Sequence, residues 1–267
     1  MFLVYFLAAA RRGDETMTLD RWVPFRNESA GIRCRIFIFP HAGGNAAFYR
    51  PLRRMMPSEI DLCPIELPGR AARLEEAPIT LMGTLIDKLS RALLPLMDVP
   101  FGIFGHSVGA WTAFEAARRL RSADGQRARH LFVSGRGSPS RVSTNLPLPR
   151  ARSRDELLAI LHRFGGTPAA VMQRQELIAA LLPALQADLA LADQYAMESA
   201  DQLACSITAF GGADDDSHSG CLESWSKFTR AKFRTCILPG GHFYFSQEAG
   251  ALVGEIVRDL RICGSLI

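Results

Sequence analysis

Lysine is scarce in this chain: of its 31 basic residues, 28 are arginines and 3 are lysines. The net charge of +4 is modest, and the basic residues are spread along the sequence rather than gathered in blocks. Proteins that bind nucleic acid usually carry such blocks or a basic arm. We therefore expect no nucleic-acid partner. An acidic protein partner stays open, although a solvated surface explains the charge more simply.

Cysteine pairs and metal-binding motifs are also missing. The six cysteines form no C-x-x-C pair, and neither an H-E-x-x-H motif nor a cluster of cysteine and histidine occurs. This pattern argues against the usual zinc sites and against a disulfide framework. Several cysteines lie in apolar runs, as buried free thiols do. We expect a cytoplasmic protein without a bound metal; its cysteines are Cys34, Cys63, Cys205, Cys221, Cys236 and Cys263.

The start of the chain lacks a complete targeting signal. Residues 1–10 are apolar, but ten residues cannot span a bilayer. A secretory signal would carry its basic residues before the apolar run, whereas Arg11 and Arg12 follow it. We expect no membrane partner. Met17 opens a sequence that is typical of a protein start, so we interpret residues 1–16 as a non-native or disordered extension.

Strand and helix patterns alternate along the rest of the chain. Repeating units of this kind predict a mostly parallel sheet with helices on both faces, within a single domain over residues 17–267. Apolar, strand-like runs occupy residues 33–40, 61–67, 101–106, 129–134, 204–210 and 233–239. Helical patterns occupy residues 48–56, 79–97, 110–120, 223–230 and 247–263.

One stretch breaks the alternation. From about residue 150 to 200 the chain carries helical patterns without a strand, beginning with a capping box between Ser153 and Glu156. A helical segment inserted between two strands is expected to lie over the carboxyl edge of the sheet, where parallel sheets place their chemistry. We interpret it as a lid.

Ser107 is the candidate nucleophile. It stands in Gly105-His-Ser-Val-Gly109, between an apolar run and a helix-favouring run. A strand, G-x-S-x-G and a helix together form the nucleophile elbow, in which the serine sits on a strained turn and the glycines let strand and helix approach closely. The alternative is that this G-x-S-x-G segment forms an ordinary glycine turn without a nucleophile.

A serine nucleophile needs a general base, and His242 is our choice. It follows the last predicted strand directly, where a loop can carry an imidazole over the elbow. His106 adjoins Ser107 and should point away from it. The remaining histidines are expected to be structural or exposed; they are His41, His130, His162 and His218.

The imidazole in turn needs a carboxylate acceptor. Asp214, Asp215 and Asp216 follow the penultimate strand, although such an acidic run is often only a solvated turn. Their position gives the chain order serine, aspartate, histidine, which is that of α/β-hydrolases. Asp214 is the first carboxylate after the glycines and is our prediction, with Asp215 as the alternative.

Two backbone amides are expected to form an oxyanion hole. Val108 begins the helix after the elbow, where the helix dipole favours negative charge. The second amide should come from the loop of small residues after the first strand, and Ala42 is the expected donor. His41 in the same loop is not counted as catalytic.

Six motifs in order resemble those of type II (external, editing) thioesterases, which accompany nonribosomal peptide and polyketide synthetases. The resemblance extends from about Trp22 to the last helix. Asp216 and His218 depart from it, because a more apolar sequence is expected after the aspartate. The motifs are Phe39-Pro-His-Ala-Gly-Gly44, Leu67-Pro-Gly-Arg70, Gly105-His-Ser-Val-Gly109, Phe164-Gly-Gly-Thr-Pro168, Gly211-Gly-Ala-Asp214 and Gly241-His242-Phe243.

The resemblance implies an α/β-hydrolase fold and a monomeric enzyme that releases acyl or aminoacyl groups from the phosphopantetheine arm of carrier domains. It implies no cofactor, because the substrate carries the arm, and among family members the chain looks most like one from a siderophore pathway. Arg70, Arg152, Arg154 and Arg163 are candidates to meet an acidic carrier domain or its phosphate, and solvated arginines are the simpler alternative. The alternatives are a carboxylesterase, lipase or acyltransferase on the same fold, and a non-catalytic module that only docks carrier domains.

Overall fold

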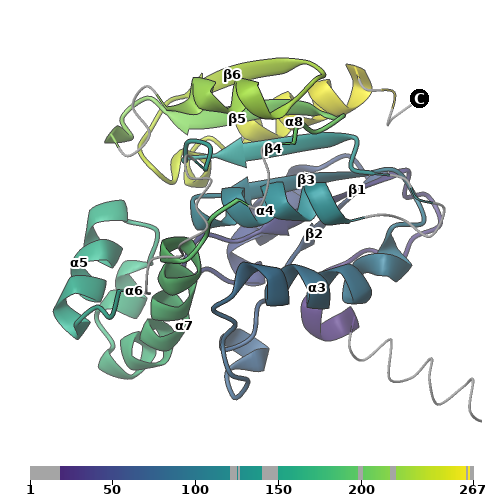
Figure 1. Ribbon diagram of the computed structural model, residues 1–267. Coiled ribbons are helices and arrows are strands. Elements are labelled where there is room, and N and C mark those ends of the chain that lie inside the picture. The colour runs from purple at the N-terminus through teal and green to yellow at the C-terminus, as the bar shows by residue number, and fades with distance from the viewer. Residues whose placement is uncertain are drawn as a thin grey trace, which may run out of the picture.

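A single parallel sheet forms the centre of the protein. The computed structural model describes residues 19–120, 125, 127–139, 150–197, 201–216, 221–262 and 264. Its strand order is β2-β1-β3-β4-β5-β6, and each neighbouring pair is parallel (Figure 1), so the predicted parallel sheet is confirmed. The strands are β1 (Cys34–Phe39), β2 (Ile60–Pro64), β3 (Phe101–His106), β4 (His130–Ser134), β5 (Ser206–Gly212) and β6 (Phe233–Leu238). The expected extension, residues 1–16, lies outside the described residues.

Helices cover both faces of this sheet. On one face, α4 (Val108–Arg119) packs against β1, β3 and β4, and α3 (Met82–Leu93) packs beside α4 in the same apolar core. On the other face, α2 (Arg50–Met55) and α8 (Ala249–Ile262) pack together over a second core. In α3 the buried residues Leu85, Leu89 and Leu93 recur every four positions, which puts them on one face of the helix. Burial of that face holds α3 in the core beside α4.

Two predicted helices differ from the observed ones. The helix expected at 79–97 becomes α3, which ends at Leu93, followed by a 3₁₀ turn over Leu94–Leu96. Pro95 has no amide hydrogen and cannot continue the α-helical hydrogen bonds. The helix expected at 223–230 is a 3₁₀ helix over Leu222–Phe228, with Trp225 and Phe228 buried against the core.

The insertion between β4 and β5 is helical, as predicted. It contains α5 (Arg154–Phe164), α6 (Ala169–Met172) and α7 (Gln175–Asp193), which lie together beside one end of the sheet (Figure 1). The capping box is present: Ser153 Oγ accepts from the Glu156 amide at 3.2 Å, and the Glu156 carboxylate accepts from the Ser153 amide at 2.8 Å. We call residues 150–197 the helical insertion.

Helix α7 connects the insertion to the rest of the protein. Its length and composition alone would allow it to cross a membrane. Here, however, Leu191 belongs to the main core and Leu185 to a smaller core shared with α5, and Ala42 of the loop after β1 packs against both cores. Helix α7 therefore packs, partly buried, between the sheet and the rest of the insertion.

Candidate active site

The turn between β3 and α4 has the backbone strain expected of a nucleophile elbow. Ser107 has φ 56° and ψ −120°, a backbone conformation that residues other than glycine rarely adopt. A Cβ on Gly105 would lie 2.1 Å from the Gly109 carbonyl oxygen, and a Cβ on Gly109 would lie 2.3 Å from the Phe39 carbonyl oxygen. Only glycine fits at both positions. The elbow predicted from the sequence is therefore present.

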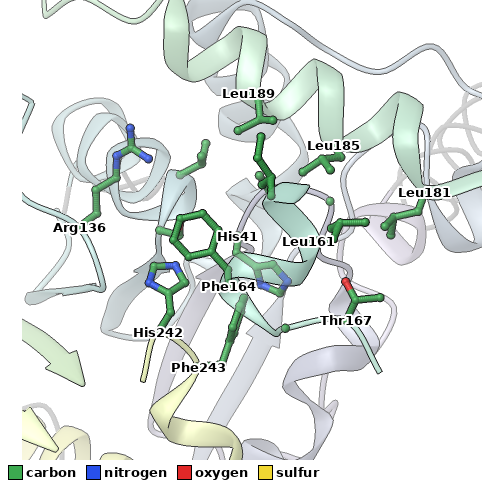
Figure 2. A pocket seen from close by; sticks show the side chains of 16 residues that line it. His41, Arg136, Leu161, Phe164, Thr167, Leu181, Leu185, Leu189, His242 and Phe243 are labelled. Carbon is green, nitrogen blue, oxygen red and sulfur yellow. The ribbon is translucent and has the colours of Figure 1, made fainter. Parts of the chain in front are cut away.

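Ser107 lines a cavity between the sheet and the helical insertion. Its amide donates to the Ser134 carbonyl of the neighbouring strand β4 at 2.8 Å, which fixes the turn. The cavity has a volume of about 110 Å³, and both Ser107 and His242 line it. Leucines of α5 and α7 form its far wall (Figure 2), so the insertion closes the cavity with apolar side chains.

His242 and Asp215 form a buried pair next to this cavity. His242 follows β6, and its Nδ1 lies 2.7 Å from the Asp215 Oδ2. The His242 ring is packed between Phe164 of the insertion and His106, with each ring centroid at 4.7 Å. This packing leaves the imidazole fixed and shielded from bulk water.

The prediction that Asp214 contacts His242 is corrected by this geometry. Asp214 is exposed, and its amide donates to the Gly240 carbonyl at 2.9 Å. The Asp215 amide donates to the Gly212 carbonyl at 3.2 Å, which closes a turn after β5. That turn directs Asp214 to solvent and carries the next carboxylate, Asp215, inward. Asp216 is exposed as well.

The two residues expected to supply the oxyanion donors, Ala42 and Val108, both line the cavity. Val108 is the first residue of α4, and the first amides of a helix have no intrahelical acceptor. In the loop after β1, the Gly43 amide donates to Asp188 and the Gly44 amide to the His41 carbonyl. In the described part of the chain, the Ala42 amide has no protein acceptor.

A buried ion pair holds that loop in place. Asp188 of α7 accepts from Arg70 through two bonds of 2.7 and 2.8 Å and from the Gly43 amide at 2.7 Å. Arg70 also donates to the Gly44 carbonyl at 2.9 Å. Arg70 is only 5% exposed, so it cannot meet a partner protein. The prediction that Arg70 meets a carrier domain is therefore wrong. Arg152 is likewise engaged, by Asp193, whereas Arg154 and Arg163 are exposed.

The other histidines have separate surroundings. His41 Nδ1 lies 3.1 Å from the Tyr49 hydroxyl, and burial together with the nearby His242 and Arg70 lowers the pKa of His41 to about 3. His106 Nδ1 lies 2.9 Å from the Ser134 hydroxyl, and that hydroxyl lies 2.8 Å from the Tyr244 hydroxyl. His130 is buried in the sheet, and His162 is exposed. His218 lies outside the described residues.

Comparison with known proteins identifies the chain. Residues 34–261 match the model of the thioesterase domain family. The chain belongs to the thioesterase family. It is therefore a thioester hydrolase, and the fold around its elbow is the α/β-hydrolase fold of its structural neighbours.

Several relatives of this thioesterase are named for the biosynthesis of natural products. It is 32% identical to the gramicidin S biosynthesis protein GrsT of Aneurinibacillus migulanus, over 91% of this chain and 95% of the relative. It is 34% identical to a probable cadicidin biosynthesis thioesterase of Streptomyces griseus, over 94% and 70% of the two chains. A solved type II thioesterase, BorB from the borrelidin biosynthetic cluster, is 33% identical with a TM-score of 0.78, over 90% and 98%. Together these matches place the chain among the type II thioesterases of nonribosomal peptide and polyketide pathways, as the motifs indicated.

Two residues of the thioesterase site escaped the sequence analysis. Asp188 lies three positions after Leu185 and three before Leu191, on the buried face of α7. A carboxylate on an apolar helix face is a signal of a buried partner, and it could have been noticed. Arg136, which follows β4 and lines the cavity, lies in a loop dense in glycine, proline and serine that gave no pattern.

Proposed function

We propose that this thioesterase hydrolyses misprimed or stalled acyl and aminoacyl thioesters on the phosphopantetheine arms of carrier domains of a nonribosomal peptide or polyketide synthetase. The observation that carries the proposal is the strained Ser107 in a cavity that His242, the partner of Asp215, also lines, in a chain of the thioesterase family. Relatives named for gramicidin S and borrelidin biosynthesis support the choice of pathway.

In the proposed mechanism, Ser107 Oγ attacks the thioester carbonyl while His242 takes its proton. Asp215 accepts the Nδ1 hydrogen of His242, which sets the tautomer and stabilises the imidazolium. The amides of Ala42 and Val108 stabilise the oxyanion. When the carbon–sulfur bond breaks, His242 returns the proton to the departing thiol. Water, deprotonated by His242, then attacks the acyl-enzyme and releases the acid and free Ser107.

The helical insertion serves as a lid in this proposal, with its leucines shaping the acyl compartment and its edge admitting the long arm. The chemistry uses protein groups alone, so no cofactor is required beyond the arm that the substrate carries. We further propose a monomer that acts in the cytoplasm, which five free cysteines among the described residues support. A siderophore pathway is the proposed setting, on the strength of the sequence resemblance.

The test compares an acyl carrier-protein thioester with a matched oxygen ester. The thioester should react at least tenfold faster in kcat/KM, and a preference for the oxygen ester would favour the carboxylesterase alternative. Ser107→Ala should abolish hydrolysis while carrier-domain binding stays near wild type. Undiminished hydrolysis by that variant would remove Ser107 from the mechanism, and wild-type protein that only binds carrier domains would favour the docking module.

A further inference from the structure

The hydroxyl of one buried tyrosine, Tyr49, makes two contacts with the residue that precedes Ala42. It accepts from the His41 amide at 3.3 Å and lies 3.1 Å from the His41 Nδ1. Because the oxygen accepts from the amide, its own hydrogen can be donated to Nδ1. Tyr49 is the last residue of a 3₁₀ helix over Ala46–Tyr49 and is fully buried, which fixes the position of the hydroxyl. We call these two hydrogen bonds the Tyr49 anchor.

The Ala42 amide shares a peptide unit with the His41 carbonyl. In a planar trans peptide, the N–H and the C=O point in opposite directions. The Gly44 amide donates to the His41 carbonyl at 2.9 Å. The His41 ring packs so closely against Gly44 that a Cβ there would lie 2.7 Å from the ring. With the Tyr49 anchor at its amide and its ring, His41 is held from both ends. The direction of the Ala42 N–H therefore depends on how His41 is held.

The His41 ring also contacts the loop that carries the proposed general base. It packs edge-on against Phe243, with the ring centroids 4.7 Å apart, and Phe243 directly follows His242 in the chain. Figure 2 shows His41 beside Phe243. The Tyr49 ring is itself stacked on Phe245 at 6.0 Å. The Tyr49 anchor thus lies where the loop after β1 meets the loop after β6.

The charge of His41 suits this arrangement. A protonated imidazole has a hydrogen on both nitrogens and could not accept from Tyr49. Burial, together with the nearby His242 and Arg70, lowers the pKa of His41 to about 3, so His41 is neutral at pH 7. A neutral ring also does not oppose the positive charge that His242 acquires when it takes the proton of Ser107.

We propose that Tyr49 is a positioning residue for the hydrolysis, whose hydroxyl acts through His41 to hold the Ala42 amide in the direction that donates to the oxyanion. The inference rests on the role that the proposed function gives to Ala42. Tyr49 is buried and does not line the cavity, so it does not touch the substrate. Because the oxyanion forms only during the reaction, loss of the anchor should lower kcat and leave KM nearly unchanged.

The first test is Tyr49→Phe in the full-length protein, which keeps the buried ring and removes only the hydroxyl. The substrate is the butyryl thioester of N-acetylcysteamine, which needs no carrier domain. We expect kcat to fall roughly 10- to 100-fold, because a displaced donor should cost less than the ~10²–10³-fold of a donor that is removed outright. Titration of Ser107 with a fluorophosphonate gives the active fraction, so kcat is expressed per active site.

A butyl trifluoromethyl ketone separates the oxyanion from the other steps. Ser107 adds to its carbonyl while the serine proton passes to His242, and the resulting negative oxygen occupies the oxyanion hole. The inhibition constant should rise in Tyr49→Phe by about the same factor by which kcat/KM falls. A purely structural effect would lower the active fraction and leave both values per active site unchanged.

Two variants of His41 test the link independently. His41→Asn offers an oxygen acceptor near the position of Nδ1, whereas His41→Leu offers none. His41→Asn should therefore retain a kcat roughly fivefold above that of His41→Leu, the range for one hydrogen bond. Combining His41→Leu with Tyr49→Phe should lower kcat by less than the product of the two separate losses, because both changes break the same bond.

Tyr195→Phe is the matched control. It also removes a single tyrosine hydroxyl that makes a hydrogen bond, in this case to Glu115 at 2.6 Å. Neither Tyr195 nor Glu115 lines the cavity, and neither belongs to the loop after β1. This variant should keep kcat and the inhibition constant close to wild type.

Three results overturn the inference. The first is a kcat of Tyr49→Phe, per active site, that equals that of Tyr195→Phe. The second is a loss that appears in KM, or in kcat without a matching rise in the inhibition constant. The third is an equal kcat for His41→Asn and His41→Leu, which decides the question even where Tyr49→Phe does not fold. Wild-type protein that hydrolyses this small thioester but no acyl carrier protein would overturn the proposed function and leave the inference intact.

Discussion

Asp188 of the helical insertion and Arg70 of the loop after β2 form a buried, two-bond ion pair across the edge of the active site, with N–O distances of 2.7 and 2.8 Å. The same carboxylate accepts from the Gly43 amide, and the same guanidinium donates to the Gly44 carbonyl. The insertion is thereby tied directly to the loop that carries Ala42. A change at this pair should affect both the stability of the fold and the geometry of the oxyanion hole.

Asp188→Asn tests that link. It leaves a buried arginine without its counter-charge, and breaking one side of a buried pair typically costs about 3–5 kcal/mol. We expect a lower urea midpoint and, because the loop after β1 loses its anchor, a lower kcat with a smaller change in KM. Replacing both partners, Arg70→Met with Asp188→Leu, should recover much of the stability but not kcat.

Asp193→Asn is the control for that experiment, because the Arg152–Asp193 pair is more exposed, at 13% and 26% of the side chains against 6% and 5% for Arg70 and Asp188. Pairs of that kind contribute roughly 0–1 kcal/mol. If Asp188→Asn were as mild as Asp193→Asn in both measurements, the Arg70–Asp188 pair would have no special role.

Asp215→Asn tests which of the two neighbouring aspartates is the acceptor for His242. The asparagine side chain can hold His242 in the wrong tautomer, and the equivalent change in a serine protease lowers kcat by about 10⁴. Asp214→Asn should stay close to wild type, since Asp214 is exposed and does not contact His242. The check is the steady-state rate on one acyl carrier protein. A crippled Asp214→Asn with an active Asp215→Asn would reverse the assignment.

Gly109→Ala tests the steric basis of the elbow. Its methyl would overlap the carbonyl oxygens of Phe39 and Pro40, at 2.3 and 2.5 Å, so the strand and helix would have to separate. We expect loss of soluble, folded protein or a large drop in thermal midpoint. Gly254→Ala in α8 is the control, because nothing lies within 4 Å of the methyl that alanine adds there. Alanine at this position should stabilise the helix by about 1 kcal/mol, and equal behaviour of the two variants would contradict the steric argument.

The raised pKa of Glu66 predicts that the free energy of unfolding depends on pH. Burial raises the pKa of Glu66 from its usual 4.5 to about 7, although the Ala46 amide, Arg70 and Arg73 oppose the shift. Between these pH values the folded state holds a proton that the unfolded chain releases, so the contribution of Glu66 to the free energy of unfolding falls as pH rises.

The variant Glu66→Gln cannot ionise, and its stability relative to wild type should therefore increase from pH 4.5 to 7. Urea denaturation at several pH values measures the difference. Glu75→Gln, at an exposed glutamate, is the control and should show a nearly constant difference. A constant difference for Glu66→Gln as well would show that Glu66 ionises alike in both states.

The sequence by itself determined the alternation of strands and helices, the elbow at Ser107 and the position of His242 after the last strand. These features follow from local rules: apolar periodicity, the glycine spacing of a tight turn and the chain order of the elements. The family resemblance followed from the same segments, and the comparisons confirm it.

Only the tertiary structure decided which of two adjacent aspartates turns inward, because Asp214 and Asp215 differ in the hydrogen bonds of one turn and not in chemistry. It also decided that Arg70 is buried against Asp188, a partner 118 residues away. The charge of Arg136 in the cavity likewise depends on the packing of Trp111 and α7 around it. Contacts between distant segments set the surroundings of a charged side chain, and a local pattern of residues carries no record of them.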